Sequence, residues 1–170
     1  MFAIEGAPAV SRGQSTEREA DENVLDLQRF FPYRLAVLAE EVSRTLAQLY
    51  SERFELTRHE WRVLAALAVN RQMAAKDIAD YCTLDKMSVS RAVAALEGKA
   101  YLTRLEDPAD RRNKILRLTS AGRALYQKIV PLALARERHI LDALTSAEQG
   151  ALDVIMKKLL AQTRGLRERG

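Results

Sequence analysis

The amino-acid sequence predicts a mainly α-helical protein with one small β-hairpin. Apolar residues recur at helical spacing through most of the 170 residues, whereas residues 101–105 and 114–118 alternate between polar and apolar side chains. The first of these two segments directly follows helices that are joined by short connections. Closely spaced helices with a hairpin behind them are typical of a winged helix-turn-helix, which is the fold class we expect.

The chain begins with a segment that has no periodic pattern. Residues 1–23 mix Gly, Pro, Ser and charged residues, so we expect a flexible arm there. Pro32 suits the first turn of a helix. Apolar residues then follow at helical spacing to about Arg53, which predicts a long amphipathic helix within residues 24–53.

The middle of the chain predicts the helix-turn-helix. Thr57 and Glu60 match a capping box, which begins a helix that continues through Leu67. A short helix and a tight turn at 83–84 come next, and Asp85 caps a further helix. The residues of this last helix that we expect in the core are Val89, Val93 and Leu96.

The hairpin completes a winged lobe that we assign to residues 54–119. Asp107, Pro108 and Asn113 mark the reversal between its two strands. A helix begins at Thr119 or Ser120, and Pro131 implies a kink or break in it.

The last helix begins with a second predicted capping box, which is TSAE at 145–148. The apolar residues that follow it form one stripe: Leu152, Ile155, Leu159 and Leu160. The amphipathic helices near the two ends of the chain exceed what a compact winged domain can cover. We therefore assign 24–53 and 120–170 to a dimerisation region and expect a homodimer. The alternative is that these helices pack on each other within one chain.

The distribution of charge indicates a polyanion as partner. The net charge is only +4, but the segment from Lys86 to Arg123 holds nine Lys and Arg against four Asp and Glu, so it carries +5 and the remainder −1. A merely solvated helix face, the alternative, tends to interleave the two signs.

Enzymatic and membrane functions find little support in the sequence. His59 and His139 lie far apart, and the chain has no glycine-rich phosphate loop and no pattern of metal ligands. We therefore expect neither an enzyme nor a bound cofactor or metal. One cysteine cannot form an internal disulfide, and no apolar run approaches the length of a signal peptide or membrane span. We expect a cytoplasmic protein that does not contact membranes.

The helix after Asp85 carries the predicted contacts to double-stranded DNA. With its apolar residues turned to the core, its other side faces outward, and such a helix enters the major groove with its first turns against the bases. Arg91 can bind a guanine, serines can donate to bases or phosphates, and Met87 can touch a thymine methyl group. The predicted contact residues on this helix are Lys86, Met87, Ser88, Ser90 and Arg91.

The hairpin adds a second set of cations. Arg111 or Arg112 at its tip can enter the minor groove, and Asp110 can orient an arginine by pairing with it. The residues that we expect to position the protein on phosphates are Arg104, Lys114 and Arg117. A hairpin that serves only solubility is the alternative.

Four short motifs resemble the multiple-antibiotic-resistance-regulator (MarR) family. They are LDKMSVSR at 84–91, LE at 96–97, DPADRR at 107–112 and LTSAGR at 118–123. The resemblance implies a homodimeric winged helix-turn-helix repressor on near-palindromic operators, released by a small aromatic and often anionic effector. It also implies that Arg91 is the recognition-helix arginine, that Asp110 braces it, and that Arg111 or Arg112 enters the minor groove.

The sequence departs from the family pattern where the wing begins. The family usually has Gly just before the first wing strand, whereas this chain has Ala100 there and Gly98 two residues earlier. Either Ala100 adopts the left-handed conformation, at a cost on the order of 1 kcal/mol, or the helix ends early at Gly98.

A second resemblance concerns the effector. PYR at 32–34 and HEWRVL at 59–64 are similar to regulators of aromatic-acid catabolism, which include sensors of hydroxycinnamoyl thioesters. The residues that this resemblance places at an effector pocket are Tyr33, Arg34, His59, Trp61 and Arg62. Trp61 or Tyr33 would stack on the ring, and an arginine would pair with the carboxylate. The alternative is that Trp61 belongs to the core and the others form a solvated face.

Cys82 and the class of partner leave further alternatives. Cys82 falls on the inner side of its helix, which favours a buried inert thiol over a redox sensor. A winged helix can also bind protein or RNA instead of duplex DNA. Its basic segment leads us to expect a DNA-binding repressor that a ligand releases, with protein or RNA binding as the alternative.

Overall fold

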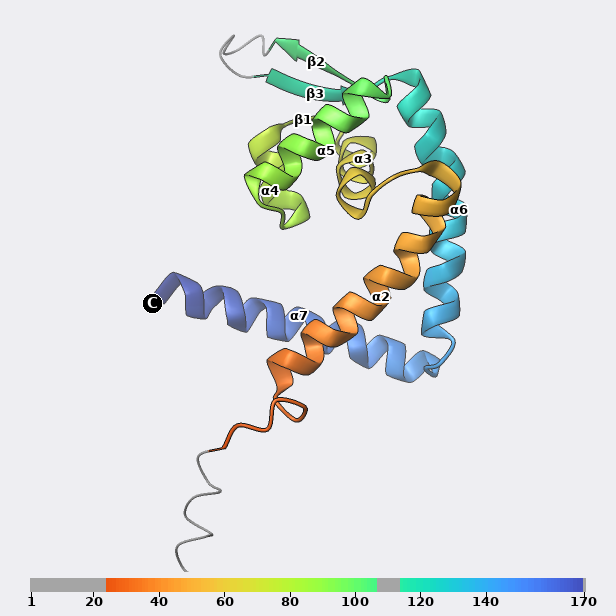
Figure 1. Ribbon diagram of the computed structural model, residues 1–170. Helices are drawn as coiled ribbons and strands as arrows, with labels where there is room; N and C mark the ends of the chain where they lie inside the picture. Colours follow the sequence, from red (N-terminus) through yellow and green to blue (C-terminus); the bar gives the residue numbers. More distant parts are fainter. Residues whose placement is uncertain (1–23, 107–113, 170) are drawn as a thin grey trace, which may run out of the picture. The chain divides into compact units, whose positions relative to one another are not determined.

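The computed structural model describes residues 24–106 and 114–169 (Figure 1). The chain divides into two units, Met1–Glu41 and Val42–Gly170. The expected arm at residues 1–23 lies outside the described residues. The first unit contains the beginning of α2, and the second unit holds the remainder of α2 and the other described helices and strands.

Helix α2 spans Phe31–Phe54, so Pro32 lies in its first turn as predicted. Phe31, Leu35 and Leu38 are about half exposed in the first unit. The helix ends at Phe54. Glu55 follows with a φ of +52°, and the next residue is fully buried Leu56.

Helix α3 (Arg58–Asn70) begins with the capping box that the sequence predicted. The Thr57 Oγ1 accepts the Glu60 N–H at 3.2 Å, and the Glu60 carboxylate accepts the Thr57 N–H at 3.1 Å. Its core residues are Val63, Leu64, Ala66 and Leu67. Through these side chains α3 lies against α4, α5, α6 and the sheet.

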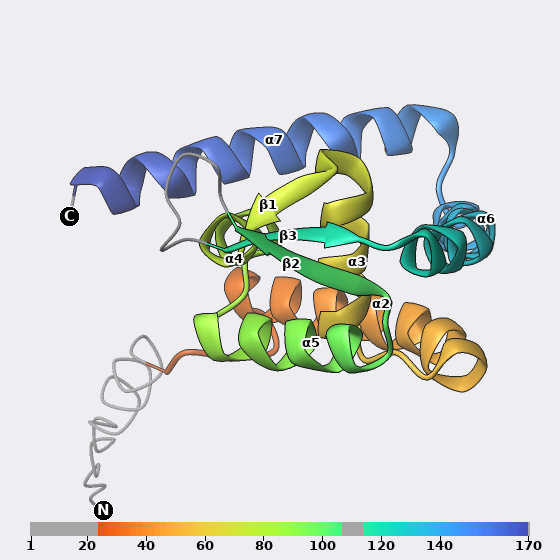
Figure 2. The ribbon, with the colours of Figure 1, turned by 90° about the horizontal axis from the view of Figure 1, so that it is seen from above.

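The sheet has three strands, one more than the sequence predicted. The additional strand is β1 (Gln72–Ala74), which pairs antiparallel with β3. In Figure 2 β3 (Lys114–Leu118) lies between β1 and β2 (Leu102–Glu106). Three residues are too few to show alternation, so only the pairing with β3 distinguishes β1 from a loop.

Helices α4 (Ala75–Cys82) and α5 (Lys86–Gly98) form the helix-turn-helix. The turn between them places Thr83 in the left-handed region, with a φ of +53°. Asp85 caps α5 as predicted, because its side chain accepts the Ser88 N–H at 2.8 Å. The predicted core residues of α5 are all buried: Val89, Val93 and Leu96.

Ala100 takes the left-handed conformation that the sequence left open. Helix α5 continues through Gly98, and Ala100 has a φ of +57°. The N–H of Tyr101 bonds to the Leu96 carbonyl and that of Ala100 to the Glu97 carbonyl, both at 2.9 Å. This is a Schellman motif with alanine in the position that usually holds glycine. The reversal predicted at residues 107–113 lies outside the described residues.

Helix α6 (Ser120–Leu141) continues through Pro131, so of the kink or break expected there, the break does not occur. A proline removes one N–H from the helix, and the bonds on either side of it maintain the remainder. Thr119 caps α6 by accepting the Gly122 N–H at 3.1 Å.

Helix α7 (Ser146–Arg169) also begins as predicted, because Thr145 and Glu148 form the second capping box. None of its side chains is buried. The apolar stripe of α7 is therefore open to solvent in the single chain.

Gly122 cannot carry a larger side chain. A Cβ at this position would lie 1.9 Å from the carbonyl oxygen of Tyr101, which is fixed because it accepts the Thr119 N–H at 3.0 Å. We expect Gly122→Ala to lower the free energy of unfolding by about 2 kcal/mol or more, since the backbone must shift.

Thermal unfolding followed by circular dichroism checks this prediction. Gly98→Ala is the matched control, because a Cβ there meets nothing within 4 Å and the helix gains by about 0.5–1 kcal/mol. Equal unfolding temperatures for the two variants would contradict the predicted clash.

Candidate nucleic-acid interface

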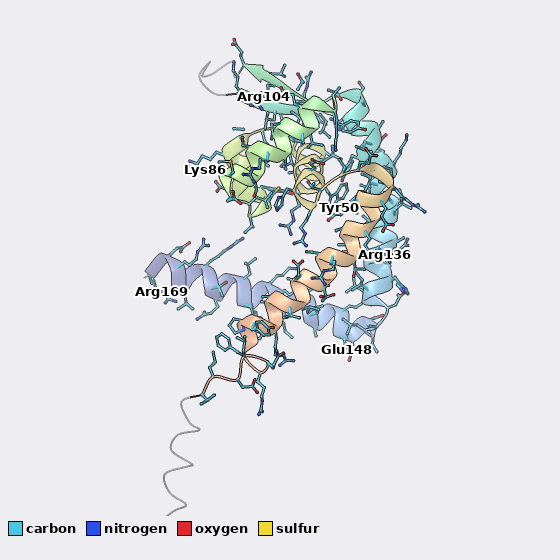
Figure 3. All side chains as sticks on the ribbon, in the orientation of Figure 1. Tyr50, Lys86, Arg104, Arg136, Glu148 and Arg169 are labelled. Atoms are coloured by element: carbon cyan, nitrogen blue, oxygen red, sulfur yellow. The ribbon has the colours of Figure 1, made fainter. Side chains whose placement is uncertain are left out.

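The outer side of α5 displays the residues that the sequence assigned to DNA contacts. Lys86, Met87, Ser90 and Arg91 are exposed, whereas Val89 and its core neighbours face inward. The geometry follows from helical periodicity, because burying one side of α5 leaves these residues on the other. Figure 3 shows Lys86 at the beginning of this helix and Arg104 on the neighbouring hairpin.

Ser88 differs from its neighbours because its hydroxyl is already engaged. It donates to the Asp85 carboxylate at 2.6 Å, and the Ser88 N–H donates to the same group. These two hydrogen bonds hold the pKa of Asp85 below its ordinary value. The Ser88 hydroxyl oxygen can therefore still accept a hydrogen bond, while its proton is already donated to Asp85 at the beginning of the helix.

A basic hollow of about 230 Å³ lies between α5, the beginning of α4 and the hairpin. Its apolar lining comes from Val89, Val93 and Leu116. Its cations are Lys76, Lys86, Arg104 and Lys114. Lys76 was missed by sequence reasoning, although a cation in the first turn of α4 was a signal that could have found it.

Two of these cations are paired with carboxylates. The Arg104 Nε lies 2.8 Å from Glu97 on α5, and the Lys114 Nζ lies 3.1 Å from Glu106 across the hairpin. Because all four side chains are substantially exposed, these ion pairs contribute little to stability. A phosphate that binds here competes with a carboxylate for each cation.

The hairpin separates cations that the sequence grouped together. In the register of β2 and β3, Arg104 is opposite Leu116, whereas Arg117 is opposite Thr103. Successive residues of a strand point to opposite sides, so Arg104 and Lys114 face α5 and Arg117 faces away from it. The predicted tip residues lie outside the described residues: Asp110, Arg111 and Arg112.

Comparison with known proteins agrees with this geometry. Residues 54–113 match the model of the MarR family. The crystal structure of a MarR/EmrR family transcriptional regulator from Acinetobacter sp. ADP1 is 28% identical, with a TM-score of 0.75 over 83% of this chain and 99% of that one. Residues 54–113 are therefore similar to the MarR family, and the fold is that of a MarR-type winged helix-turn-helix.

Two further proteins are similar to this chain. An uncharacterised HTH-type transcriptional regulator of Bacillus cereus is 27% identical over 118 residues, which are 69% of this chain and 78% of that protein. The structure of Bordetella bronchiseptica BpsR, whose DNA binding is regulated by 6-hydroxynicotinic acid, covers 81% of this chain and 97% of its own. At 24% identity and a TM-score of 0.73, the likeness to BpsR concerns the fold.

Trp61, which the sequence suggested for an effector pocket, lies in an aromatic stack. Its ring is 5.9 Å from those of Tyr50 and Tyr126, with interplanar angles of 22° and 19°. The stack joins α2, α3 and α6 at the edge of the core. Burial raises the pKa of Tyr50, and the nearby positive charges of Arg58 and Arg62 partly offset this increase. Trp61 is thus partly buried and packs against the hydrophobic core.

The structure brings together two of the five effector candidates. Trp61 and Arg62 line one small, largely apolar hollow with Tyr81 and Cys82 on α4. His59 is exposed and does not line this hollow. Tyr33 and Arg34 belong to the first unit.

The described residues also bear on metals and membranes. No described helix is long and apolar enough to cross a membrane. Likewise, in residues 24–106 and 114–169 no cluster of three or more His, Cys, Asp or Glu side chains could hold a metal ion.

Cys82 is partly rather than fully buried, and its Sγ lies 3.5 Å from the Arg62 carbonyl. Burial raises the pKa of its thiol, while the charge of Arg62 opposes that shift. Since the thiolate is the reactive form, we expect Cys82 to react with iodoacetamide more slowly than free cysteine at pH 7.4. Arg62→Gln should slow the reaction further.

Mass spectrometry of the alkylated protein across a pH series measures this. The midpoint of the rate profile should lie above that of free cysteine, and unfolding in guanidinium should remove the difference. A midpoint below that of free cysteine would indicate an activated thiol instead.

Proposed function

We propose that this protein is a DNA-binding transcription regulator of the MarR type that recognises a near-palindromic operator as a homodimer. The observation that carries the proposal is the outer side of α5, where polar and cationic side chains stand beside the basic hollow. The HTH-type regulator from Bacillus cereus and the DNA-binding protein BpsR support it. The proposed activity is regulation rather than catalysis.

In this proposal α5 enters the major groove and the hairpin lies over the neighbouring backbone. Arg91 reads a guanine, Met87 contacts a thymine methyl group, and Ser90 binds a base or phosphate. Around the hollow, Lys86, Arg104 and Lys114 bind phosphates, which position α5 without reading sequence. The sequence further assigns Arg111 or Arg112 to the minor groove and Asp110 to bracing an arginine, and these roles remain predictions.

The homodimer is proposed because the apolar side of α7 has no partner in the single chain. Ile155, Leu160 and Leu166 are each more than half exposed, as is Met156. Monomeric proteins rarely leave so many large apolar side chains in contact with water along one helix. A second copy would cover them and would present two α5 helices to half-sites about one turn of DNA apart.

We further propose that the regulator is a repressor released by an aromatic acid or its thioester. The 6-hydroxynicotinic acid that regulates BpsR is an effector of this chemical class. Arg62 at the small apolar hollow is suited to pair with a carboxylate, while Trp61 also stacks with Tyr50 and Tyr126. Tyr33, Arg34 and His59 remain sequence candidates. The ligand would favour a spacing of the two lobes that does not fit the operator.

The test of DNA recognition is binding to duplexes recovered by the wild type from a randomised library. We expect Arg91→Ala to lower the preference for the recovered duplex over unrelated DNA by about tenfold or more, because a base contact is lost. Lys114→Ala should weaken binding to all duplexes alike and lower the salt slope by about 0.9. Arg111→Ala/Arg112→Ala should abolish selective binding.

Fluorescence anisotropy at several salt concentrations measures these constants. Lys128→Ala, which removes an exposed cation of α6, is the matched control and should bind as the wild type does. If the wild type prefers no duplex at moderate salt, the proposal fails and a protein or RNA partner takes its place.

The dimer is tested by one substitution on α7. Ile155→Glu places a charge within the proposed interface and should convert a dimer to monomers, because burying an unpaired carboxylate is costly. Ala161→Glu places the same charge on the side of α7 away from the apolar stripe and should leave the dimer intact. Sedimentation velocity distinguishes the two states, and a wild-type monomer at micromolar concentration would contradict the proposal.

A further inference from the structure

The ammonium group of Lys99 binds two acceptors at the connection between α2 and α3. Its Nζ donates to the Glu55 carbonyl at 2.7 Å and lies 3.2 Å from the Glu60 carboxylate. The same carboxylate oxygen accepts the Thr57 N–H in the capping box. Three segments therefore meet at one cation: the end of α2, the beginning of α3 and the end of α5.

Glu60 is the one charged residue in the buried core of the described chain, with 6% of its surface exposed. A buried carboxylate needs both hydrogen bonds and an opposite charge, and Lys99 supplies the charge. Lys99 itself retains 35% of its side-chain exposure. The cation is thus held at the edge of the core by partners with fixed positions.

Lys99 also stands directly before the hairpin. It is the C-cap residue of α5, and the left-handed Ala100 follows it and leads into β2. The hydroxyl of Thr119 donates to the Ala100 carbonyl at 2.7 Å, which joins the beginning of α6 to the same turn. A displacement of Lys99 would therefore shift the end of the recognition helix and the root of the wing together.

We propose that Lys99 is a positioning residue for operator recognition, which sets the orientation of α5 and the hairpin relative to the end of α2. The proposal rests on the DNA-binding function inferred above. Apolar contacts such as that of Leu56 are not directional, whereas a charge-assisted hydrogen bond defines both distance and angle. In a dimer joined outside this lobe, the angle at this corner determines the distance between the two α5 helices, so Lys99 controls which half-site spacing is accepted.

The experiment compares half-site spacings. The wild type first selects a duplex from a randomised library, and that duplex is then lengthened or shortened by one base pair at its centre. Anisotropy gives the dissociation constants of the wild type, Lys99→Met, Lys99→Arg and the control Lys128→Met on all three duplexes. We expect Lys99→Met to reduce the preference for the selected spacing by at least about threefold, and Lys99→Arg to restore most of it.

Salt dependence separates positioning from a phosphate contact. If Lys99 only bound a phosphate, Lys99→Met would weaken all three duplexes equally and lower the salt slope by about 0.9, which would overturn the inference. An unchanged spacing preference in Lys99→Met would overturn it as well. If circular dichroism shows that Lys99→Met is unfolded at the assay temperature, Lys99→Gln replaces it. The same results are then expected of Lys99→Gln, and the same results would overturn the inference.

Failure of the proposed function has a different signature. If the wild type selects no duplex, the result contradicts both the proposed DNA recognition and the inference about Lys99. If the wild type selects a duplex and the Lys99 variants keep the same spacing preference, the result contradicts only the inference about Lys99. Lys128→Met, with the same loss of charge on exposed α6, should retain the wild-type preference throughout.

Discussion

The winged helix-turn-helix lobe depends on the burial of one side of α3. Val63, Leu64 and Leu67 have no exposed surface, and α3 contacts α4, α5, α6 and β3. Each such side chain stabilises the fold by about 2 kcal/mol when it leaves water. Because α5 is fixed to α3 by the inward residues Val89 and Val93, its outer side takes no part in the core. That side can then carry cations and hydroxyl groups without loss of stability.

Much of the fold was predictable because it depends on short spacings. A capping box needs only residues three apart, so Thr57 with Glu60 identified the beginning of α3. Helical periodicity likewise identified the buried side of α5. Strand β1 has no such local signal, because three residues become a strand only through pairing with β3. The continuity of α6 through Pro131 also depends on the surrounding helix rather than on the proline alone.

The candidate site was predictable where its residues lie on the side of α5 that faces away from the core. Once Val89 and Val93 are assigned inward, Arg91 must face outward. The ion pair of Arg104 with Glu97 could not be predicted in this way, since it joins a helix to a strand and depends on how the hairpin leaves α5. The stacking of Trp61 with two tyrosines also joins residues that are distant in sequence. Local patterns therefore predict which side chains are displayed, while tertiary packing determines their partners.

Four described non-glycine residues have a positive φ, and two of them, Glu55 and Ala100, adjoin Lys99. Glu55 follows α2 and accepts a hydrogen bond from Lys99, and Ala100 precedes the hairpin and follows Lys99. Each left-handed residue costs on the order of 1 kcal/mol, which burial of its neighbours Leu56 and Leu102 offsets. A glycine at either position would remove the cost but would also admit other backbone angles. Because an alanine or glutamate held by its neighbours has fewer alternatives, the direction of α2 and that of the wing are both restricted at the same corner.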